Sequence, residues 1–167
     1  MDNAAPLSES LEDYLEAILR LETDHKVARQ KEIAEVLKIQ RGSVTSALKV
    51  LAGKGLVNYE PYSYVTLTPK GRKIAREIER RHNVIKDFLF RVLRIDHDKA
   101  DTTACHMEHV MDTATVNSLV KFIEFIDTCP RAGADWIESY VTFCSRNKVD
   151  GITCRACLEK CVTEFSA

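Results

Sequence analysis

Residues 29–68 restrict most strongly how this 167-residue chain can fold. They contain two amphipathic segments, then two glycines, and then two segments whose residues favour β-strands. Residues 29–37 and 41–52 predict two short helices, because their apolar residues recur at helical spacing. Three residues, 38–40, separate them. Two short helices joined by a tight connection are typical of a helix-turn-helix unit.

The residues after the second helix predict a β-hairpin. Gly53 and Gly55 predict the end of the helix. Residues 56–59 and 64–68 predict two strands, with a turn at Pro61 between them. A hairpin directly after the second helix is a wing, so this part of the chain is predicted to be a winged-helix DNA-binding domain.

In a helix-turn-helix unit the second helix enters the major groove by its N-terminal end. Small hydroxyl side chains allow close approach there, and basic side chains supply charge for bases or phosphates. The turn of the wing is also expected to touch the DNA backbone. The candidate DNA-binding residues are Arg41, Ser43, Thr45, Ser46, Lys49, Lys54, Tyr62 and Ser63.

The charge distribution supports a polyanionic partner. The chain has 24 Lys and Arg against 25 Asp and Glu, but residues 26–81 hold 13 of the basic and only 5 of the acidic residues. A basic segment inside an acidic chain indicates a face that binds a polyanion, although a solvated charged face would give the same counts.

The rest of the chain is predicted to be helical. A first helix runs to about Thr23, and Thr68 followed by Pro69 predicts the start of a long helix over 69–93. Helices are also expected over 99–111 and 115–127. These last two are too small for a closed core of their own, so we expect a homodimer. No apolar run approaches a membrane span and the N-terminus lacks signal-peptide features, so a cytoplasmic location without a membrane is expected.

Three residues near the middle of the helix 99–111 have the types that bind a divalent transition metal. Cys105, Glu108 and His109 lie at i, i+3 and i+4, which puts a thiolate, a carboxylate and an imidazole on one helical face. A buried cysteine beside two exposed polar residues would show the same pattern. Three ligands leave a site open, and the candidate partners are Asp13 and Glu16 of the first helix and His82.

The C-terminal segment carries four cysteines in the pattern C-x9-C-x2-C-x3-C, namely Cys144, Cys154, Cys157 and Cys161. Four thiolates close in sequence suit a tetrahedral zinc ion or an iron-sulfur cluster. Cys129 could replace one of the four. Buried or redox-paired cysteines are the alternative.

Residues 7 to about 132 resemble the diphtheria toxin repressor family of metal-dependent transcription regulators. The resemblance rests on LSESLEDYLEAIL, IAEVLKIQRGSVTSALKVLAGKGLV, LTPKG, RRHNVIKDFL and TTACHMEHV, in this order. It implies an N-terminal winged helix, a helical dimerisation domain and repression of metal-uptake genes when the cell has enough iron or manganese.

The resemblance places Asp13, Cys105, Glu108 and His109 on the family's primary metal ligands. A cysteine at 105 resembles the iron-responsive branch, whereas Asp13 with Glu16 resembles the manganese-responsive branch. A thiolate favours softer metals than Mn2+, so Fe2+ is expected and Mn2+ is the alternative.

A second family-type site is expected to be incomplete. His82 matches an ancillary-site histidine, and Asp101 falls where the iron branch has another ligand. Lys86, however, stands where the resemblance implies a carboxylate, and a cation cannot bind a metal ion.

Together these observations predict a mostly α fold with a winged helix-turn-helix domain (1–75), a helical metal-binding and dimerisation domain (76–132) and a small Cys-rich helical tail (133–167). The predicted function is a metal-dependent repressor, not an enzyme, that binds a palindromic operator in double-stranded DNA. A regulator that senses redox state or an iron-sulfur cluster through its tail is an alternative, and a thiol-disulfide catalyst built on Cys154 and Cys157 is a weaker one.

Overall fold

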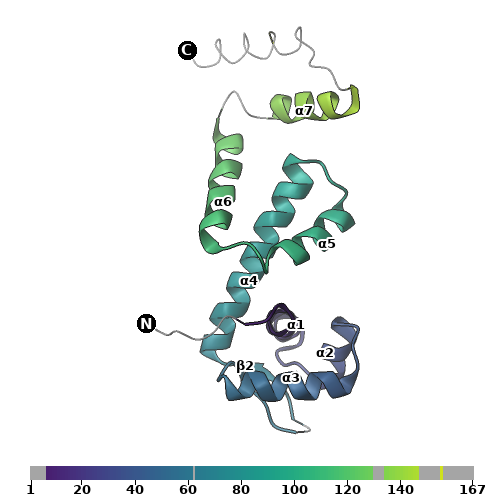
Figure 1. The fold of residues 1–167 in the computed structure, drawn as a ribbon, viewed down its shortest axis with the longest axis vertical. Coiled ribbons are helices and arrows are strands. Elements are labelled where there is room, and N and C mark those ends of the chain that lie inside the picture. The colour runs from purple at the N-terminus through teal and green to yellow at the C-terminus, as the bar shows by residue number, and fades with distance from the viewer. Residues whose placement is uncertain (1–6, 62, 130–133, 147–154, 156–167) are drawn as a thin grey trace. The chain divides into compact units, whose positions relative to one another are not determined.

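The computed structural model describes residues 7–61, 63–129, 134–146 and 155, and these are mostly helical, as the sequence predicts. The chain divides into two compact units, Met1–Arg81 and His82–Ala167. The elements, labelled in Figure 1, are α1 (Glu9–His25), α2 (Gln30–Val36), α3 (Arg41–Gly53), β1 (Val57–Asn58), β2 (Thr66–Leu67), α4 (Pro69–Asp87), η1 (Phe88–Val92), α5 (His97–Met107), α6 (Thr113–Thr128) and α7 (Ala134–Arg146).

The first unit is a winged helix built around one apolar core. Helices α1, α2 and α3 lie against one another (Figure 1), and each contributes fully buried aliphatic side chains, among them Leu15, Ile33 and Leu48. The recurrence of such residues at helical spacing is what fixes which face of each helix is buried. The predicted helix-turn-helix and wing are confirmed, with α3 as its second helix.

The wing strands are shorter than the sequence suggested. β1 and β2 pair antiparallel with Val57 opposite Leu67, but each strand has only two residues. Just before β2, Val65 N–H donates to the carbonyl oxygen of Ala28 at 2.8 Å, and the Val65 carbonyl accepts from Ala28 N–H at 3.1 Å. The segment between α1 and α2 therefore also pairs with the returning strand of the wing.

A buried carboxylate joins three elements of this unit. Glu22 near the end of α1 is 9% exposed, accepts a hydrogen bond from the backbone N–H of Leu67 at 3.0 Å and another from Arg72 Nη2 at 2.8 Å. These bonds satisfy both carboxylate oxygens, which burial requires. Glu22 thus ties α1 to the returning wing strand and to the start of α4.

Helix α4 begins where Thr68 and Pro69 predict, and its first turn fits tightly against the wing. Thr68 Oγ1 accepts from Gly71 N–H at 3.1 Å and donates to the carbonyl oxygen of Gly55 at 2.8 Å. A Cβ at residue 71 would overlap the carbonyl oxygen of Leu56. Only glycine allows this close approach of helix and backbone.

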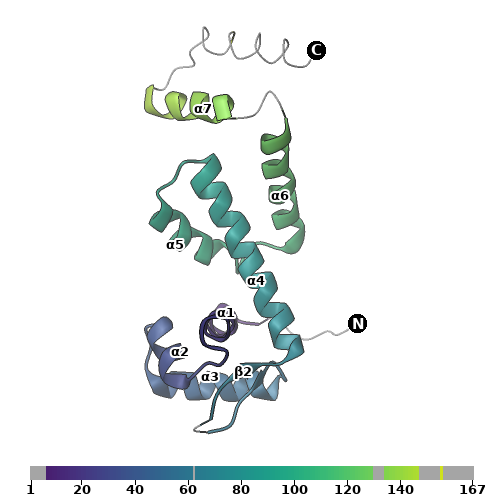
Figure 2. The same cartoon turned by 180° about the vertical axis from the view of Figure 1, so that it is seen from behind.

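The second unit begins at His82, within α4. Beyond Asp87 the helix continues as the π-helical turn η1, so the long helix expected over 69–93 is present with a change of pitch near its end. Figures 1 and 2 show α5 and α6 on opposite sides of this helix. Ile85 and Leu89 pack on the α5 side with Ala100 and Ala104, and Val92 packs with Ile126 of α6 and Ile137 of α7.

Helix α5 is shorter at its C-terminal end than expected. It starts at His97, with the Asp96 side chain accepting from the N–H groups of Asp98 and Lys99, and it ends at Met107 rather than at residue 111. The carboxylate at the N-cap and the turn at residues 108–110 set these limits. None of the helices in the described part of the chain is long and apolar enough to cross a membrane.

We expect Gly71→Ala to destabilise the first unit by about 1–3 kcal/mol, because the added methyl must displace the Leu56 backbone. The free energy of unfolding, measured by urea titration followed by circular dichroism, checks this. Gly53→Ala is the matched control: a Cβ there meets nothing within 4 Å, so helix propensity should raise stability by up to about 1 kcal/mol. Equal effects of the two substitutions would contradict the close contact.

Candidate metal centre and nucleic-acid interface

The predicted metal-binding motif lies across the end of α5. Cys105 is in the last turn of the helix, Glu108 is its C-cap residue with helical dihedral angles, and His109 lies in the following turn. The N–H of Glu108 still donates to the carbonyl oxygen of Ala104 at 3.0 Å. The helical spacing of the motif is therefore kept up to Glu108, although the helix ends one residue earlier.

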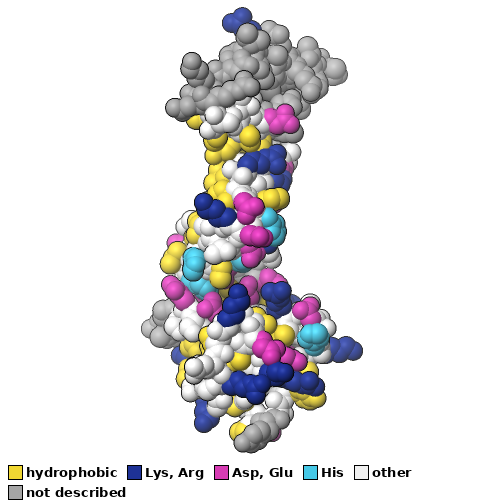
Figure 3. Space-filling model, turned by 90° about the vertical axis from the view of Figure 1, so that its right-hand side faces the viewer, with side chains coloured by type: hydrophobic (Ala, Val, Ile, Leu, Met, Phe, Trp, Pro, Cys, Tyr) yellow, Lys and Arg dark blue, Asp and Glu magenta, His cyan; other side chains and the backbone are white. Residues whose placement is uncertain are grey.

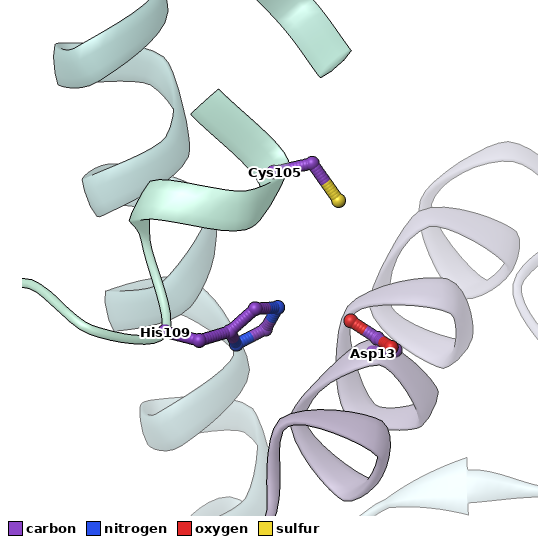
Figure 4. A group of neighbouring side chains, drawn as sticks. All are labelled: Asp13, Cys105 and His109. Carbon is purple, nitrogen blue, oxygen red and sulfur yellow. The ribbon is translucent and has the colours of Figure 1, made fainter. Parts of the chain in front are cut away.

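The structure brings Cys105 and His109 together. One potential ligand atom of each, the thiol sulfur and a ring nitrogen, lie within 4.8 Å of each other. Figure 4 shows both side chains extending to the same side of the α5 segment, and the third residue drawn there, Asp13, belongs to α1 of the other unit. The His109 side chain is only 5% exposed, so it is placed by packing.

Glu108 is the most unusual residue of this unit, because it is a carboxylate with no exposed surface. Its Oε2 lies 2.7 Å from His82 Nδ1. Its Oε1 accepts no hydrogen bond from the residues that the structure describes, and His109 Nε2 lies 3.6 Å from it. Burying a charged oxygen without a partner is costly, so this atom fits a site in which a cation is bound.

His82 lies between two carboxylates. Besides Glu108 on the Nδ1 side, the Nε2 atom of His82 lies 3.3 Å from Asp101 Oδ1. The same oxygen accepts from Lys86 Nζ at 2.5 Å. The ammonium of Lys86, with a further contribution from the His82 ring, holds the pKa of the Asp101 carboxyl below its usual value.

The two acidic candidates in the first unit, Asp13 and Glu16, both lie on α1 and are both half-buried. Their spacing of three residues puts them on neighbouring turns of one helix face. Glu12 beside them pairs with Arg81 at 3.5 Å, so it is already engaged within its own unit.

The donor set of unit 2 fits a divalent transition metal. This unit offers the thiol of Cys105, the buried carboxylate of Glu108 and the imidazoles of His82 and His109. Nitrogen and sulfur donors with carboxylates suit Mn2+, Fe2+, Co2+, Ni2+ or Zn2+ rather than Ca2+ or Mg2+, which prefer oxygen alone.

The predicted DNA-contacting residues of α3 are placed on its open face. The core-facing side of α3 is formed by Val44, Leu48 and Leu51, all buried. Figure 3 shows a band of Lys and Arg side chains across the visible face of the winged-helix unit. Arg41, Ser43, Ser46, Lys49, Lys54 and Ser63 are exposed and Thr45 is half-exposed, whereas Tyr62 lies outside the described residues.

Sequence reasoning missed one basic residue at this surface. A pocket of about 460 Å3 is lined by residues from the α2 start and the wing. There the Arg29 guanidinium lies over the Tyr64 ring, 5.3 Å from its centroid, and Arg29 Nη2 donates to the Tyr64 hydroxyl at 3.4 Å. The isolated arginine at a helix start gave no signal, because its partner is 35 residues away. The pocket residues are Arg29, Gln30, Pro61, Ser63 and Tyr64.

The structure describes Cys129 and Cys144, but not the other three cysteines of the predicted tail site. Cys144 on α7 is exposed, Cys129 is half-buried, and neither forms a disulfide with another described cysteine. Cys154, Cys157 and Cys161 lie outside the described residues, so the predicted zinc or iron-sulfur site stays a prediction.

Comparison with known proteins matches most of the chain to one family. The profile described as "Iron dependent repressor, N-terminal DNA binding domain" matches residues 6–65, and "Iron dependent repressor, metal binding and dimerisation domain" matches residues 68–137. The chain is 39% identical to an HTH-type transcriptional regulator of Methanocaldococcus jannaschii, over 71% of this chain and 95% of that protein. It is 30% identical to the HTH-type transcriptional regulator MntR of Lysinibacillus sphaericus, over 72% of this chain and 86% of that one.

Among solved structures, the manganese regulator SloR is 30% identical, with a TM-score of 0.62 over 74% of this chain. The match covers 57% of the SloR chain, so that structure is considerably longer than the matched region.

We expect Co2+ to raise the thermal unfolding midpoint of the wild type and to leave Glu108→Gln unchanged, because the neutral amide is a weak metal ligand. A site that binds only the folded chain adds about 2.7 kcal/mol of stability at a ligand concentration 100 times Kd. Differential scanning calorimetry with and without Co2+ checks this. Glu124→Gln, at an exposed acid of α6, should respond as the wild type does. If Co2+ raised the unfolding midpoint of Glu108→Gln as much as that of the wild type, Glu108 would not be a metal ligand.

Proposed function

Because the chain belongs to the iron-dependent repressor family of metal-dependent, DNA-binding transcriptional regulators, which are not enzymes, we propose that it represses transcription when Fe2+ is bound. The observation that carries this proposal is Glu108, a fully buried carboxylate that lies 2.7 Å from His82 Nδ1 and 3.6 Å from His109 Nε2. Such a cluster of potential ligands has a physical explanation if a cation binds there.

The proposed ligands are those that the sequence predicts: Asp13, Glu16, His82, Cys105, Glu108 and His109. A bound divalent cation would supply the positive charge that allows carboxylates and a thiolate to share one site. Without that charge these side chains repel one another. The carboxylates of α1 would therefore respond to metal, and α1 belongs to the same core as α3.

The proposed DNA surface is the N-terminal half of α3 together with the wing. Arg41 and Lys49 are exposed there and can neutralise phosphates, while the small side chains between them allow α3 to approach base edges. Arg29, held over Tyr64, is a further candidate for a backbone contact. Family members dimerise. A dimer of this chain would bind a palindromic operator whose half-sites lie about one turn of the DNA helix apart. The dimer would act in the cytoplasm.

The metal is proposed to be Fe2+ because Cys105 is a soft ligand in a site otherwise made of carboxylates and imidazoles. Mn2+ is the second candidate, because one solved relative is the manganese regulator SloR and another is a manganese-dependent transcriptional repressor in complex with manganese. The tail cysteines are proposed to hold zinc or an iron-sulfur cluster in a second site, separate from the site that binds Fe2+ or Mn2+.

We expect Fe2+ under anaerobic conditions to tighten DNA binding about 100-fold, which corresponds to about 2.7 kcal/mol of coupling. The probe is a duplex enriched by the Fe2+-loaded chain from a random-sequence library, and fluorescence anisotropy measures Kd. His109→Ala should lose the Fe2+ response and keep weak binding. Lys49→Ala should weaken binding both with and without Fe2+ and reduce its salt dependence. Equal Kd values for the wild type with and without Fe2+ would refute the proposed function.

We expect Cys105→Glu to shift the metal preference towards Mn2+. Mn2+ is the weakest binder of the series in almost any site, so absolute affinities do not decide the matter. The informative quantity is the ratio of the Mn2+ and Co2+ dissociation constants, which should fall by about an order of magnitude when the thiolate becomes a carboxylate. Isothermal titration calorimetry measures both constants. An unchanged ratio would mean that Cys105 does not select the metal and would favour the manganese alternative.

A further inference from the structure

A network of polar contacts in unit 2 links two of the proposed ligands, His82 and Glu108, to Asp101 and Lys86, which are not among the proposed ligands. It runs from Lys86 Nζ to Asp101 Oδ1 at 2.5 Å, from the same oxygen to His82 Nε2 at 3.3 Å, and from His82 Nδ1 to Glu108 Oε2 at 2.7 Å. Exposure falls along the chain of contacts: 50% for the Asp101 side chain, 15% for His82 and 0% for Glu108. The network thus leads from the surface to the buried carboxylate.

The two nitrogens of His82 cannot play the same role. A neutral imidazole has one N–H donor and one lone pair. Its Nδ1 faces Glu108, the buried carboxylate whose other oxygen has no hydrogen bond among the described residues, and its Nε2 faces Asp101. If Nδ1 is the nitrogen on the metal side, the proton lies on Nε2 and is donated to Asp101. A histidine that binds a metal commonly donates its other N–H to a carboxylate in this way.

Lys86 determines which role Asp101 can take. Left alone, a half-exposed carboxylate 3.3 Å from a ligand histidine would be a candidate ligand itself. The Lys86 ammonium occupies the same oxygen that faces His82. A divalent cation on that carboxylate would stand close to a fixed positive charge, which is unfavourable in a partly buried site. The ammonium also fixes the carboxylate in the position where it accepts from the ring.

We propose that Lys86 and Asp101 form a positioning pair, in which Lys86 holds Asp101 as the hydrogen-bond acceptor that orients His82 for metal binding and prevents Asp101 from becoming a ligand. The inference rests on the proposed metal site and adds two residues to it. Neither touches the ion: Asp101 acts through His82, and Lys86 acts through Asp101.

The first test is a Co2+ titration of the full chain, followed by the visible absorption of Co2+ in competition with a chelator. Asp101→Asn and Lys86→Met should each weaken Co2+ binding, by about 10- to 100-fold for the Asp101 change, which is the usual cost of losing such an acceptor. Lys86→Arg should keep most of the affinity. Lys121→Met, which removes an exposed lysine of α6, should have no effect.

Two features of this titration separate positioning from ligation. The number of Co2+ ions per chain, measured by elemental analysis, should be the same in Asp101→Asn as in the wild type. The double variant should bind no more weakly than Asp101→Asn alone, because Lys86 acts only through Asp101. Loss of one ion per chain in Asp101→Asn, or strictly additive effects in the double variant, would overturn the proposal.

The second test reads the ring proton of His82 directly. In the Zn2+-loaded, 15N-labelled chain, long-range 1H–15N correlation should place the His82 proton on Nε2, and His82→Gln assigns the signals. A proton on Nδ1 would overturn the proposal. A chain that binds no divalent metal would overturn both this inference and the proposed function. Metal binding that is unaffected by Asp101→Asn and Lys86→Met would overturn this inference alone.

Discussion

The burial of Glu108 is the constraint on which the metal site proposed for the second unit depends. Taking a carboxylate fully out of water costs several kcal/mol unless charge and hydrogen bonds compensate for it. One oxygen lies 2.7 Å from His82 Nδ1, and the other accepts no hydrogen bond from the described residues and lies 3.6 Å from His109 Nε2. Ile85, Ala100 and Ala104 pack α4 against α5 and so hold Glu108 in this position. The apolar core therefore supports an arrangement that is unfavourable by itself and that a cation would stabilise.

The sequence was informative where the chemistry is local. The spacing of Cys105 and His109 was enough to predict that they meet, because one turn of helix brings residues i and i+4 together whatever the rest of the fold does. The winged helix was predictable for the same reason, since each of its helices is marked by its own apolar periodicity. The end of α5 was not predictable in this way. Met111 continued the apolar pattern, but the chain turns after Met107.

Contacts between distant residues could not be read from the pattern. The sequence indicated only that Lys86 cannot bind a metal ion, whereas its role depends on Asp101, 15 residues away on another helix. Glu22 is a similar case: it looks like an ordinary acid near the end of α1, yet it is buried between a wing strand and α4. In both cases the packing of the helices determines which residue becomes the partner. Neither helical periodicity nor residue type predicts which distant residues come into contact.

The charges of the proposed ligands explain why metal would act as a switch rather than as a permanent part of the fold. In unit 2, Glu108 and the Cys105 thiolate would carry negative charge, whereas His82 and His109 are neutral as ligands. Among the described contacts, Lys86 pairs with Asp101, and the buried carboxylate of Glu108 faces His82. A cation bound from solution would compensate the charge of these ligands. A site compensated in this way is sensitive to the concentration of that cation, and this sensitivity is what a metal-responsive regulator requires.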